Sequence, residues 1–422
     1  MPIARTLLCS LLAAGSLVSA AEEAKPKIRV VDCDQQVQSR KRGICVNKFD
    51  DADFKAVAPG VSWWYSWYHD WANPPSGVTM EFIPMVWGKG PERLAGLEKY
   101  LAAGHKPPAV FAINEPNLKG QAFITPEEAA TLFAGIKRVA DTYRIEVVGP
   151  HMAIGSGPGD SITAEDPLEK KSLTYTFMNP FLKAFLFYTD KAKTQVPALG
   201  VHSYKDLGEL KWVVDMMYKE FNRPVWVTEY AWWNAPNEKA ARDYLIQATD
   251  FLERNPHVAG YAWFKERSDH QVISLLKPKA GELSTLGEAY VAMPVHDADV
   301  FYRIPGKLQA ESYTTMDAMD ARETDEADGF LQLNSGSNKA WAEYQVQVDK
   351  AAAFDVEFRV TGKKDDKLTI SDNGRDLATV KLMEGGWQSV GATFDLAKGP
   401  HRLHLAASAK GTAVNWIAFT AK

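Results

Sequence analysis

The sequence predicts an α/β chain of two domains, a (β/α)8 TIM barrel followed by an all-β, jelly-roll-like sandwich. Its 422 residues exceed what one ordinary core organises, so two domains are expected. Short apolar strands alternate with helical stretches from about residue 41 to 266, which is the pattern and roughly the length of a barrel. Beyond residue 305, apolar and polar residues alternate within short strands, which is typical of an antiparallel sandwich with one buried face.

The predicted barrel strands are mostly continuous apolar runs, such as Val110–Ile113 and Val225–Val227. A strand that is apolar on both faces suits a parallel sheet covered by helices. The eight strand candidates span residues 42–47, 61–68, 81–87, 109–114, 146–150, 198–203, 224–228 and 258–264.

Helical patterns fall between these strands. The segment 126–143 begins with Thr125 as an N-cap and Pro126 in its first turn. The segments 207–221 and 237–253 carry apolar residues at helical spacing, and residues 283–293 are expected to form a closing helix.

A doubly wound open sheet is the alternative to the barrel. Such a sheet, if it bound a nucleotide, would carry a glycine-rich turn that opens a helix. The nearest candidate, Gly155–Gly159, has Pro158 in the wrong place and is not followed by a helical pattern. The barrel is therefore the favoured fold.

The N-terminal residues predict export. Arg5 supplies a positive start, residues 7–18 are mostly apolar, and Val18, Ser19 and Ala20 form a small-residue cleavage site. The expected organisation is a signal peptide (1–20), a catalytic barrel (25–294), a linker (295–305) and a sandwich (306–422). We therefore expect a secreted protein, extracellular or periplasmic.

The composition limits the classes of partner. A net charge of -5 gives no electrostatic reason to expect nucleic acid or an anionic membrane. Ten of the 13 tryptophans lie before residue 270. Indole faces bind sugar rings by stacking, although barrel packing explains any single tryptophan equally well. We expect a monomer.

Two cysteines, Cys33 and Cys45, remain after the expected cleavage. In an oxidising compartment they form one disulfide, or they stay unpaired with Cys45 buried on a strand. Their spacing in the sequence leaves both alternatives open, because it does not fix their distance in space.

Two glutamates stand at the ends of predicted strands. Glu115 follows the fourth strand and Glu229 follows the seventh, and Pro116 stops the strand ladder at once. In a (β/α)8 barrel the C-terminal strand ends carry the chemistry. A buried structural ion pair is the alternative for either glutamate alone, but together they fit glycoside hydrolysis. That reaction needs one carboxylic acid to protonate the leaving oxygen and a second carboxylate to attack or activate water.

The motifs around these strands resemble glycoside hydrolase family 128. They comprise Arg42-Gly43, Trp63–Trp67, Phe82–Gly88, Ile113–Asn117, Trp226–Tyr230 and Tyr261–Phe264. The resemblance runs from about residue 40 to 270. It implies a retaining endo-β-1,3-glucanase in which Glu115 is the general acid/base and Glu229 the nucleophile. It also implies that Asn114 holds the 2-hydroxyl of the attacked sugar.

Further side chains are candidates for substrate binding. Tyr204 is expected to donate its hydroxyl to Glu229, and His202 either contacts sugar or is a core histidine. Alternation along the strands sends some aromatic candidates away from the cleft, and the sequence does not say which. The aromatic candidates are Trp64, Tyr65, Trp67, Trp87, Trp232, Trp233 and Trp263.

The C-terminal region resembles carbohydrate-binding module family 6. Its motifs are Leu308–Tyr313, Trp341–Tyr344, Gly385–Gln388 and Asn415–Ile417. The resemblance implies a structural calcium held by Gln309, Glu311 and Asn415, with no cofactor needed for catalysis. It also implies a sugar-binding loop site with Trp387. At the first aromatic position of that site stand Leu331 and Leu333, with Phe330 nearby, so binding through the sheet face is the alternative.

Three functions are consistent with the sequence. The first is endo-acting hydrolysis of a laminarin- or curdlan-like β-1,3-glucan, with exo action or another β-linkage as a close variant. The second is a β-glucan-binding protein without hydrolysis, and the third is an interaction protein that uses the sandwich alone. The presence of both Glu115 and Glu229 favours the enzyme.

Overall fold

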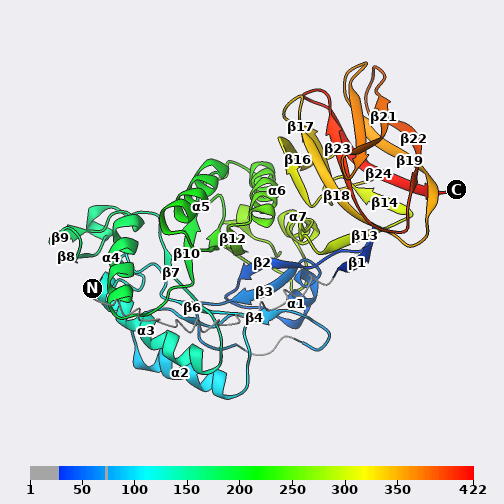
Figure 1. The fold of residues 1–422 in the computed structure, drawn as a ribbon. Coiled ribbons are helices and arrows are strands. Elements are labelled where there is room, and N and C mark those ends of the chain that lie inside the picture. Colours follow the sequence, from blue (N-terminus) through cyan, green and yellow to red (C-terminus); the bar gives the residue numbers. More distant parts are fainter. Residues whose placement is uncertain (1–27, 72–74) are drawn as a thin grey trace, which may run out of the picture.

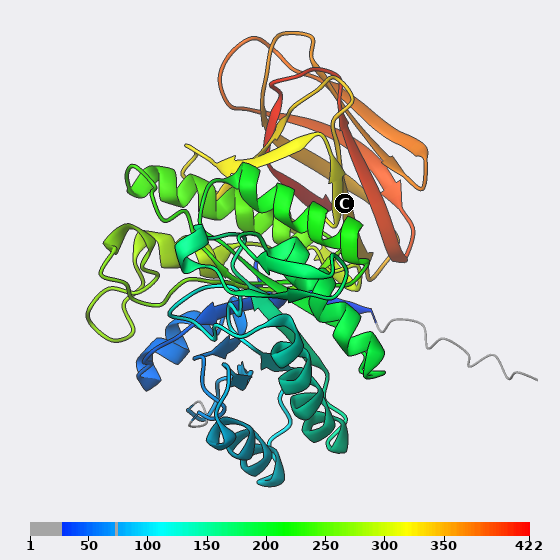
Figure 2. The same cartoon turned by 90° about the vertical axis from the view of Figure 1, so that its left-hand side faces the viewer.

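The computed structural model describes residues 28–71 and 75–422, and the predicted signal peptide lies outside them (Figure 1). A barrel and a sandwich lie side by side, with the sandwich next to helices α6 (Glu238–Arg254) and α7 (Thr285–Ala292) (Figures 1 and 2). No helix in the described part of the chain is long and apolar enough to cross a membrane.

The barrel sheet closes on itself. Its strand order is β4-β3-β2-β12-β11-β10-β7-β6-β5, and each pair is parallel. The terminal strands β4 (Glu81–Phe82) and β5 (Met85–Val86) are two halves of one predicted strand, so this segment joins the two edges. The barrel prediction is confirmed and the open-sheet alternative is wrong. The other strands are β2 (Ser39–Cys45), β3 (Val61–Tyr65), β6 (Val110–Ala112), β7 (Val147–Met152), β10 (Ala198–Ser203), β11 (Val225–Tyr230) and β12 (Val258–Trp263).

Helices follow the strands around the outside of the barrel (Figure 2). Helix α3 begins as predicted, with the Thr125 side chain accepting from the Glu128 amide and the Glu128 carboxylate accepting from the Thr125 amide. This reciprocal cap satisfies two amides that the first turn leaves unpaired. Besides α6 and α7, the barrel helices are α1 (Asp51–Val57), α2 (Pro91–Ala102), α3 (Pro126–Thr142), α4 (Met178–Lys191) and α5 (Leu207–Phe221).

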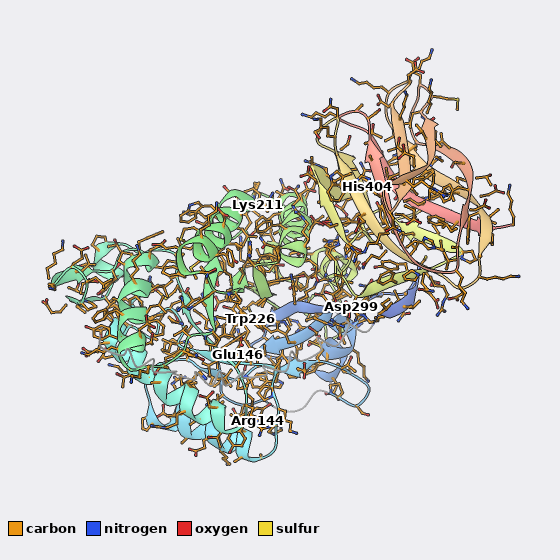
Figure 3. The ribbon with its side chains drawn as sticks, in the orientation of Figure 1. Arg144, Glu146, Lys211, Trp226, Asp299 and His404 are labelled. Atoms are coloured by element: carbon orange, nitrogen blue, oxygen red, sulfur yellow. The ribbon has the colours of Figure 1, made fainter. Side chains whose placement is uncertain are left out.

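Aromatic side chains fill the interior of the barrel. Trp63, Tyr65, Phe111 and Trp226 pack together with ring centroids of contacting pairs 5.2 to 6.4 Å apart, and Figure 3 shows Trp226 within the sheet. A Cβ atom at Gly43 would lie 2.3 Å from the Trp63 ring, so this position requires glycine. Several tryptophans therefore serve packing and not sugar binding.

Arg42 ties β2 to the C-terminal ends of α6 and α7. Its guanidinium is fully buried, pairs with Glu253, and donates to the Tyr261 hydroxyl and the Met293 and Pro294 carbonyls. Every nitrogen has a partner, as a buried cation requires.

Replacing Arg42 with methionine is expected to lower the free energy of unfolding by roughly 3–5 kcal/mol, because Glu253 then stays buried without its cation. Urea unfolding measures this loss. R40M, on the same strand, removes an exposed ion pair to Asp299 and should cost less than about 1 kcal/mol. Adding E253Q to R42M should recover part of the loss. Equal effects of R42M and R40M would contradict the assignment.

The sandwich consists of two facing sheets, and its burial alternates along each strand as predicted. One sheet has the order β1-β13-β18-β23-β20-β21, with β15 beside β18, and the other has the order β16-β17-β24-β19-β22, with β14 beside β24. Its strands are β14 (Gly306–Gln309), β15 (Thr315–Asp317), β16 (Met319–Glu323), β17 (Leu331–Ser335), β18 (Trp341–Val348), β19 (Ala352–Thr361), β20 (Lys367–Asp372), β21 (Arg375–Lys381), β22 (Gln388–Leu396), β23 (Gly399–Ala407) and β24 (Ala413–Ala421).

The structure corrects the predicted domain boundaries. The expected linker 295–305 contains strand β13 (Val300–Ile304), which lies inside the first sheet of the sandwich. Its other neighbour is β1 (Arg29–Asp32), from the segment assigned to the barrel, and the two strands pair in parallel over four residues. The sequence pattern missed this pairing because the two strands lie some 270 residues apart and both are short.

Side chains also fix the sandwich to helix α6. The Tyr313 hydroxyl donates to the buried Asp250 carboxylate, and His296 Nδ1 lies 2.7 Å from the Tyr313 carbonyl oxygen. Arg242 Nε lies 2.6 Å from Glu323 Oε1 on β16. These contacts and the β1–β13 pair leave the two domains in a fixed arrangement.

Cys33 and Cys45 are free thiols in separate places. Cys33 Sγ donates to the Arg303 carbonyl beside the sandwich, whereas Cys45 is buried in the barrel and donates to the Thr228 carbonyl. Of the two alternatives, the structure shows unpaired cysteines.

Candidate active site

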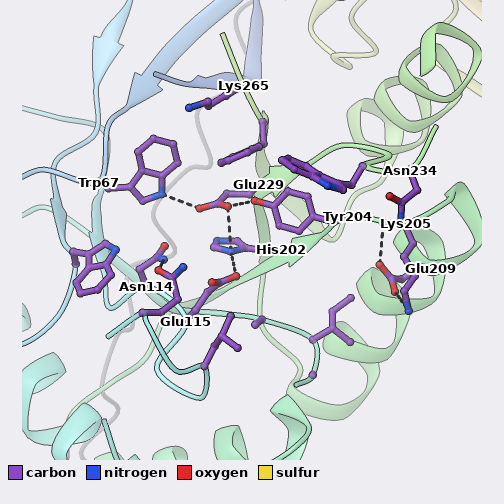
Figure 4. Close-up of a pocket in the computed structure, with 18 of the residues that line it drawn as sticks. Trp67, Asn114, Glu115, His202, Tyr204, Lys205, Glu209, Glu229, Asn234 and Lys265 are labelled. Atoms are coloured by element: carbon purple, nitrogen blue, oxygen red, sulfur yellow. Dashed lines mark hydrogen bonds and ion pairs between the residues drawn. The ribbon is translucent and has the colours of Figure 1, made fainter. Parts of the chain in front are cut away.

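A cavity of about 900 Å³ opens at the C-terminal ends of the barrel strands (Figure 4). It brings together Glu115 and Glu229, although 114 positions separate them in the chain. The predicted residues Asn114, His202, Tyr204 and Trp87 line the same cavity. The structure therefore places these predicted residues around one cavity at this end of the barrel.

Glu115 occupies a constrained turn three residues after the end of β6. Its φ of 42° and the φ of 66° at Ile113 lie in the left-handed region, which residues other than glycine rarely adopt. The Glu115 amide donates to the His151 carbonyl oxygen at 2.7 Å, which fixes the turn against β7. Glu115 is consequently held at the pocket, and the residue is only 7% exposed.

Glu229 accepts hydrogen bonds on both carboxylate oxygens. The Tyr65 hydroxyl and Trp67 Nε1 donate to Oε1 at 3.1 and 2.8 Å. The Tyr204 hydroxyl donates to Oε2, as the sequence predicted (Figure 4). These donors restrict the orientation of the carboxylate and favour its ionised form.

His202 lies between the two glutamates. Its Nδ1 is 2.8 Å from Glu115 Oε1 and 3.5 Å from Glu229 Oε2. The nearest carboxylate oxygens are therefore no farther apart than the sum of these two distances. His202 is a pocket residue bridging both carboxylates, and the core-histidine alternative does not describe it.

Burial and charge oppose each other in this cluster. Burial raises the pKa of Glu229 and the nearby charge of Glu115 raises it further, while His202, Tyr204 and Trp67 lower it, so the pKa stays above its ordinary value. Burial lowers the pKa of His202, but the charge of Glu229 and the hydrogen bond to Glu115 outweigh burial and raise it. The protonation of Glu229 and that of His202 therefore depend on each other.

The aromatic candidates divide between the pocket and the barrel packing. Trp67, Trp87 and Trp233 line the pocket, whereas Tyr65 is fully buried behind it and donates its hydroxyl to Glu229. Arg93 covers one face of Trp87, with its guanidinium carbon 5.2 Å from the ring centroid.

Two of the predicted sugar contacts, Trp64 and Trp263, are wrong because both side chains are fully buried, and a third, Trp232, does not line the pocket. Trp64 packs against Phe54 and Phe82 in the layer between sheet and helices, since alternation along β3 turns it away from the interior. Trp263 is fully buried and donates to the Ile273 carbonyl, and Trp232 packs on the Tyr244 ring of α6.

Asn114 lines the pocket and has one unpaired side-chain atom. Its Nδ2 donates to Gln121 Oε1 at 3.1 Å, while its buried Oδ1 has no protein partner. The sequence carries no signal for several polar pocket residues, because most of them lie on loops without a recognisable pattern and Glu209 lies in the first turn of α5. These are Asn47, Gln121, Lys205, Glu209, Asn234 and Lys265.

The structure places only one of the two aromatic residues predicted for the sugar-binding loop of the sandwich, Trp387, at that loop. Trp387 is half-buried and its Nε1 donates to Asp325 Oδ1 at 2.8 Å. Phe330 instead faces the barrel, under the Arg242 guanidinium of α6, so its assignment to this loop is wrong. Leu331 and Leu333 are buried in the sandwich core.

The three predicted calcium ligands have unpaired oxygens. Gln309 Oε1, Glu311 Oε2 and Asn415 Oδ1 are each buried without a hydrogen-bond partner. Burial raises the pKa of Glu311 to about 8, as expected for a carboxylate with no cation nearby. Within the described ranges, no cluster of three or more His, Cys, Asp and Glu side chains could hold a metal ion. The donor set is therefore one carboxylate and two amides, which suits a hard cation weakly.

Solved structures with the same barrel include two bacterial enzymes. A family 128 (subgroup II) endo-β-1,3-glucanase from Sorangium cellulosum is 30% identical, with a TM-score of 0.51 over 61% of this chain and 100% of that one. An endo-β-1,3-glucanase of the same subgroup from Pseudomonas viridiflava is 29% identical, with a TM-score of 0.52 over 61% of this chain and 100% of that one. No curated protein matches the chain.

Two family models cover most of the sequence. Residues 43–290 match the glycosyl hydrolase catalytic core and residues 309–421 match carbohydrate binding module (family 6). The predicted resemblance to family 128 and to the family 6 module is thereby confirmed. Since the first model spans more than half of the chain, this protein belongs to the glycosyl hydrolase catalytic core family and ends in a family 6 carbohydrate-binding module.

Proposed function

We propose that the protein hydrolyses β-1,3-glucan within the chain, by double displacement, with Glu229 as nucleophile and Glu115 as general acid/base. The observation that carries this proposal is the His202 nitrogen in contact with both carboxylates. It limits the distance between their nearest oxygens to the sum of 2.8 and 3.5 Å. Carboxylates that share one nitrogen in this way support the short spacing of retaining enzymes, about 5–5.5 Å, over the roughly 6.5–9.5 Å of inverting enzymes, which need room for a water molecule. The similar family 128 enzymes act on β-1,3-glucan, which supports the linkage.

In this mechanism Glu115 protonates the glycosidic oxygen while Glu229 attacks the anomeric carbon. The bond to the leaving sugar breaks and a covalent glycosyl ester forms on Glu229. Glu115, now ionised, takes a proton from water, and that water displaces Glu229. Asn114 Oδ1, which has no protein partner, is available to accept from the 2-hydroxyl, a contact that strengthens in the transition state.

Release of reducing sugar from soluble β-1,3-glucan tests the proposal, with a β-1,4-glucan and a β-1,6-glucan as matched substrates. Rapid loss of viscosity with slow release of ends would support endo action, and release of glucose alone would favour the exo alternative. Hydrolysis of only another linkage would overturn the substrate assignment. Binding without hydrolysis would favour the non-catalytic alternative.

The acid limb of the pH profile of kcat/KM should lie above the ordinary glutamate range. Glu229 must be ionised to attack, and its pKa is raised chiefly by burial. Because the Tyr204 hydroxyl lowers that pKa, Y204F should move the acid limb to still higher pH and lower kcat on the order of tenfold or more. Y175F, which removes a hydroxyl bound to Asp166 instead, should leave the profile in place. An unchanged acid limb in Y204F would contradict the nucleophile assignment.

We also propose that Gln309, Glu311 and Asn415 hold a calcium ion that stabilises the sandwich. The folded-state pKa of Glu311, about 8, is raised, so without a cation its ionisation destabilises the fold as pH rises through 8. Calcium needs the ionised form, so the gain in melting temperature from calcium over chelator should grow from pH 6 to 9. E311Q should abolish this gain, whereas E343Q, on the exposed side of β18, should not. A gain that is independent of pH or absent would refute the site.

Export remains a proposal that rests on residues 1–20. N-terminal sequencing of the protein recovered from culture medium or periplasm should find Ala21 first. Recovery of the full-length chain from the cytoplasm alone would contradict it.

A further inference from the structure

A second cavity of about 490 Å³ adjoins the catalytic pocket. The two cavities share Trp233, Phe264 and Lys265, and the rest of the second one is formed by the loop of residues 267–278 between β12 and α7. The pocket therefore continues past the three shared residues into a longer groove.

The direction of this groove follows from the barrel. Strand β12 stands opposite β6 across the closed sheet, so Phe264 and Lys265 lie across the opening from Glu115. In Figure 4, Glu229 lies between Glu115 and Lys265. The general acid faces the leaving oxygen, so the leaving part of the glucan lies on the Glu115 side. The second cavity is then on the side of the sugars that stay on Glu229, the glycone side.

The walls of the second cavity have the character of a sugar site. The Trp233 side chain is 41% exposed, and it packs against His270 with ring centroids 5.4 Å apart and planes inclined by 33°. Phe264 borders it on another side at 6.3 Å. Asp269 is exposed and Lys265 is half-buried, and neither forms an ion pair with any residue in 28–71 or 75–422. An aromatic face with free polar groups around it is what a pyranose ring needs.

The loop that carries these residues is held in place. Arg267 donates to both oxygens of Asp53 at 2.9 and 2.8 Å and to the Lys277 carbonyl at 2.8 Å. The Gly281 amide donates to the same carboxylate. A wall fixed in this way binds its ligand without first being ordered, which favours affinity.

We propose that this second cavity binds glucosyl units on the glycone side of the substrate, beyond those next to the cleaved bond. Trp233 provides the stacking face, Asp269 and Lys265 bind hydroxyl groups, and His270 is a positioning residue that supports Trp233. The inference rests on the proposed function and adds to it a preference for longer chains and for a particular cleavage position.

Single variants D269A and H270A test the cavity on β-1,3-gluco-oligosaccharides of three and six units labelled at the reducing end. For six units, kcat/KM should fall at least fivefold, mainly through KM, and for three units it should change less than twofold. Cleavage of the longer substrate should move toward its non-reducing end, so that the labelled fragment is longer. A histidine with only a structural role would not move the cleavage position.

H105A is the matched control. His105 is also half-buried and stacks on an aromatic ring, that of Tyr100 at 4.1 Å, but it precedes β6 at the opposite end of the barrel. It should change neither rate nor product. Suppose that the unmodified protein cleaves the glucan. If D269A and H270A then change the cleavage of short and long substrates equally, or change neither, the cavity assignment is wrong while the proposed function stands. If the unmodified protein does not cleave β-1,3-glucan, both fail.

Discussion

Replacing Glu229 with alanine is expected to abolish glucan hydrolysis while oligosaccharide binding persists. The variant removes the atom that attacks the anomeric carbon, and kcat should fall on the order of 10⁴-fold or more. Binding should persist because Trp67, Trp87 and Trp233 remain to line the pocket. Reducing-sugar release measures the first effect and titration calorimetry with a six-unit oligosaccharide measures the second. E238A, at an exposed position in the first turn of α6, is the control and should keep full activity.

Azide distinguishes the role of Glu229 from that of other residues. With an activated glucosyl substrate, azide can enter the space left by the missing carboxylate in E229A and attack the same face of the sugar. The product should be the α-glycosyl azide, of inverted configuration. Near-normal turnover by E229A, or a β-glycosyl azide, would refute the assignment of Glu229 as nucleophile.

Replacing Glu115 with glutamine should slow the hydrolysis of natural glucan by about 10²–10⁴-fold, because the leaving sugar then departs without a proton. An aryl glycoside with a good leaving group needs little protonation, so its first step should be almost unaffected. The covalent intermediate should then accumulate, visible as a burst of released phenol and as a mass increase on Glu229. Equal loss on both substrates would point to another acid.

The same azide test applies to Glu115 with the opposite outcome. In E115A, azide needs no general base and should displace Glu229 from the open face of the sugar. The product should be the β-glycosyl azide, of retained configuration. Opposite configurations from E229A and E115A would establish the two roles in one experiment.

Much of the site could be predicted because its residues sit at the ends of strongly apolar strands. Glu115 follows β6, and Glu229 lies at the end of β11. In a parallel barrel all such strand ends meet at one opening. Tyr204 could be assigned to Glu229 for the same reason, since it follows β10, the neighbour of β11. Position along a strand was sufficient information for these three.

The other site residues could not be predicted from the sequence. A strand that is buried on both faces is apolar throughout, so its sequence does not show which side chains face the barrel interior and which face the helices. Trp63, Trp64 and Tyr65 are all apolar or aromatic, so nothing in the sequence shows that Trp64 faces the helices and its neighbours face the interior. Polar residues such as Asn234 and Lys265 come from loops whose course depends on tertiary contacts. The parallel partner of β1 depends on a contact across almost the whole barrel sequence.

The place of β1 in the sheet of the sandwich has a consequence for how the two domains work together. A module on a flexible tether can search a polysaccharide in any direction, whereas here rotation would have to break the hydrogen bonds that join β1 to β13. The enzyme therefore meets a glucan surface at one constant angle between anchor and cleft. For the same reason, cleavage of the chain at one peptide bond does not release an intact sandwich. Transfer of the sandwich to another protein would require two fusion points, one on each side of the catalytic barrel.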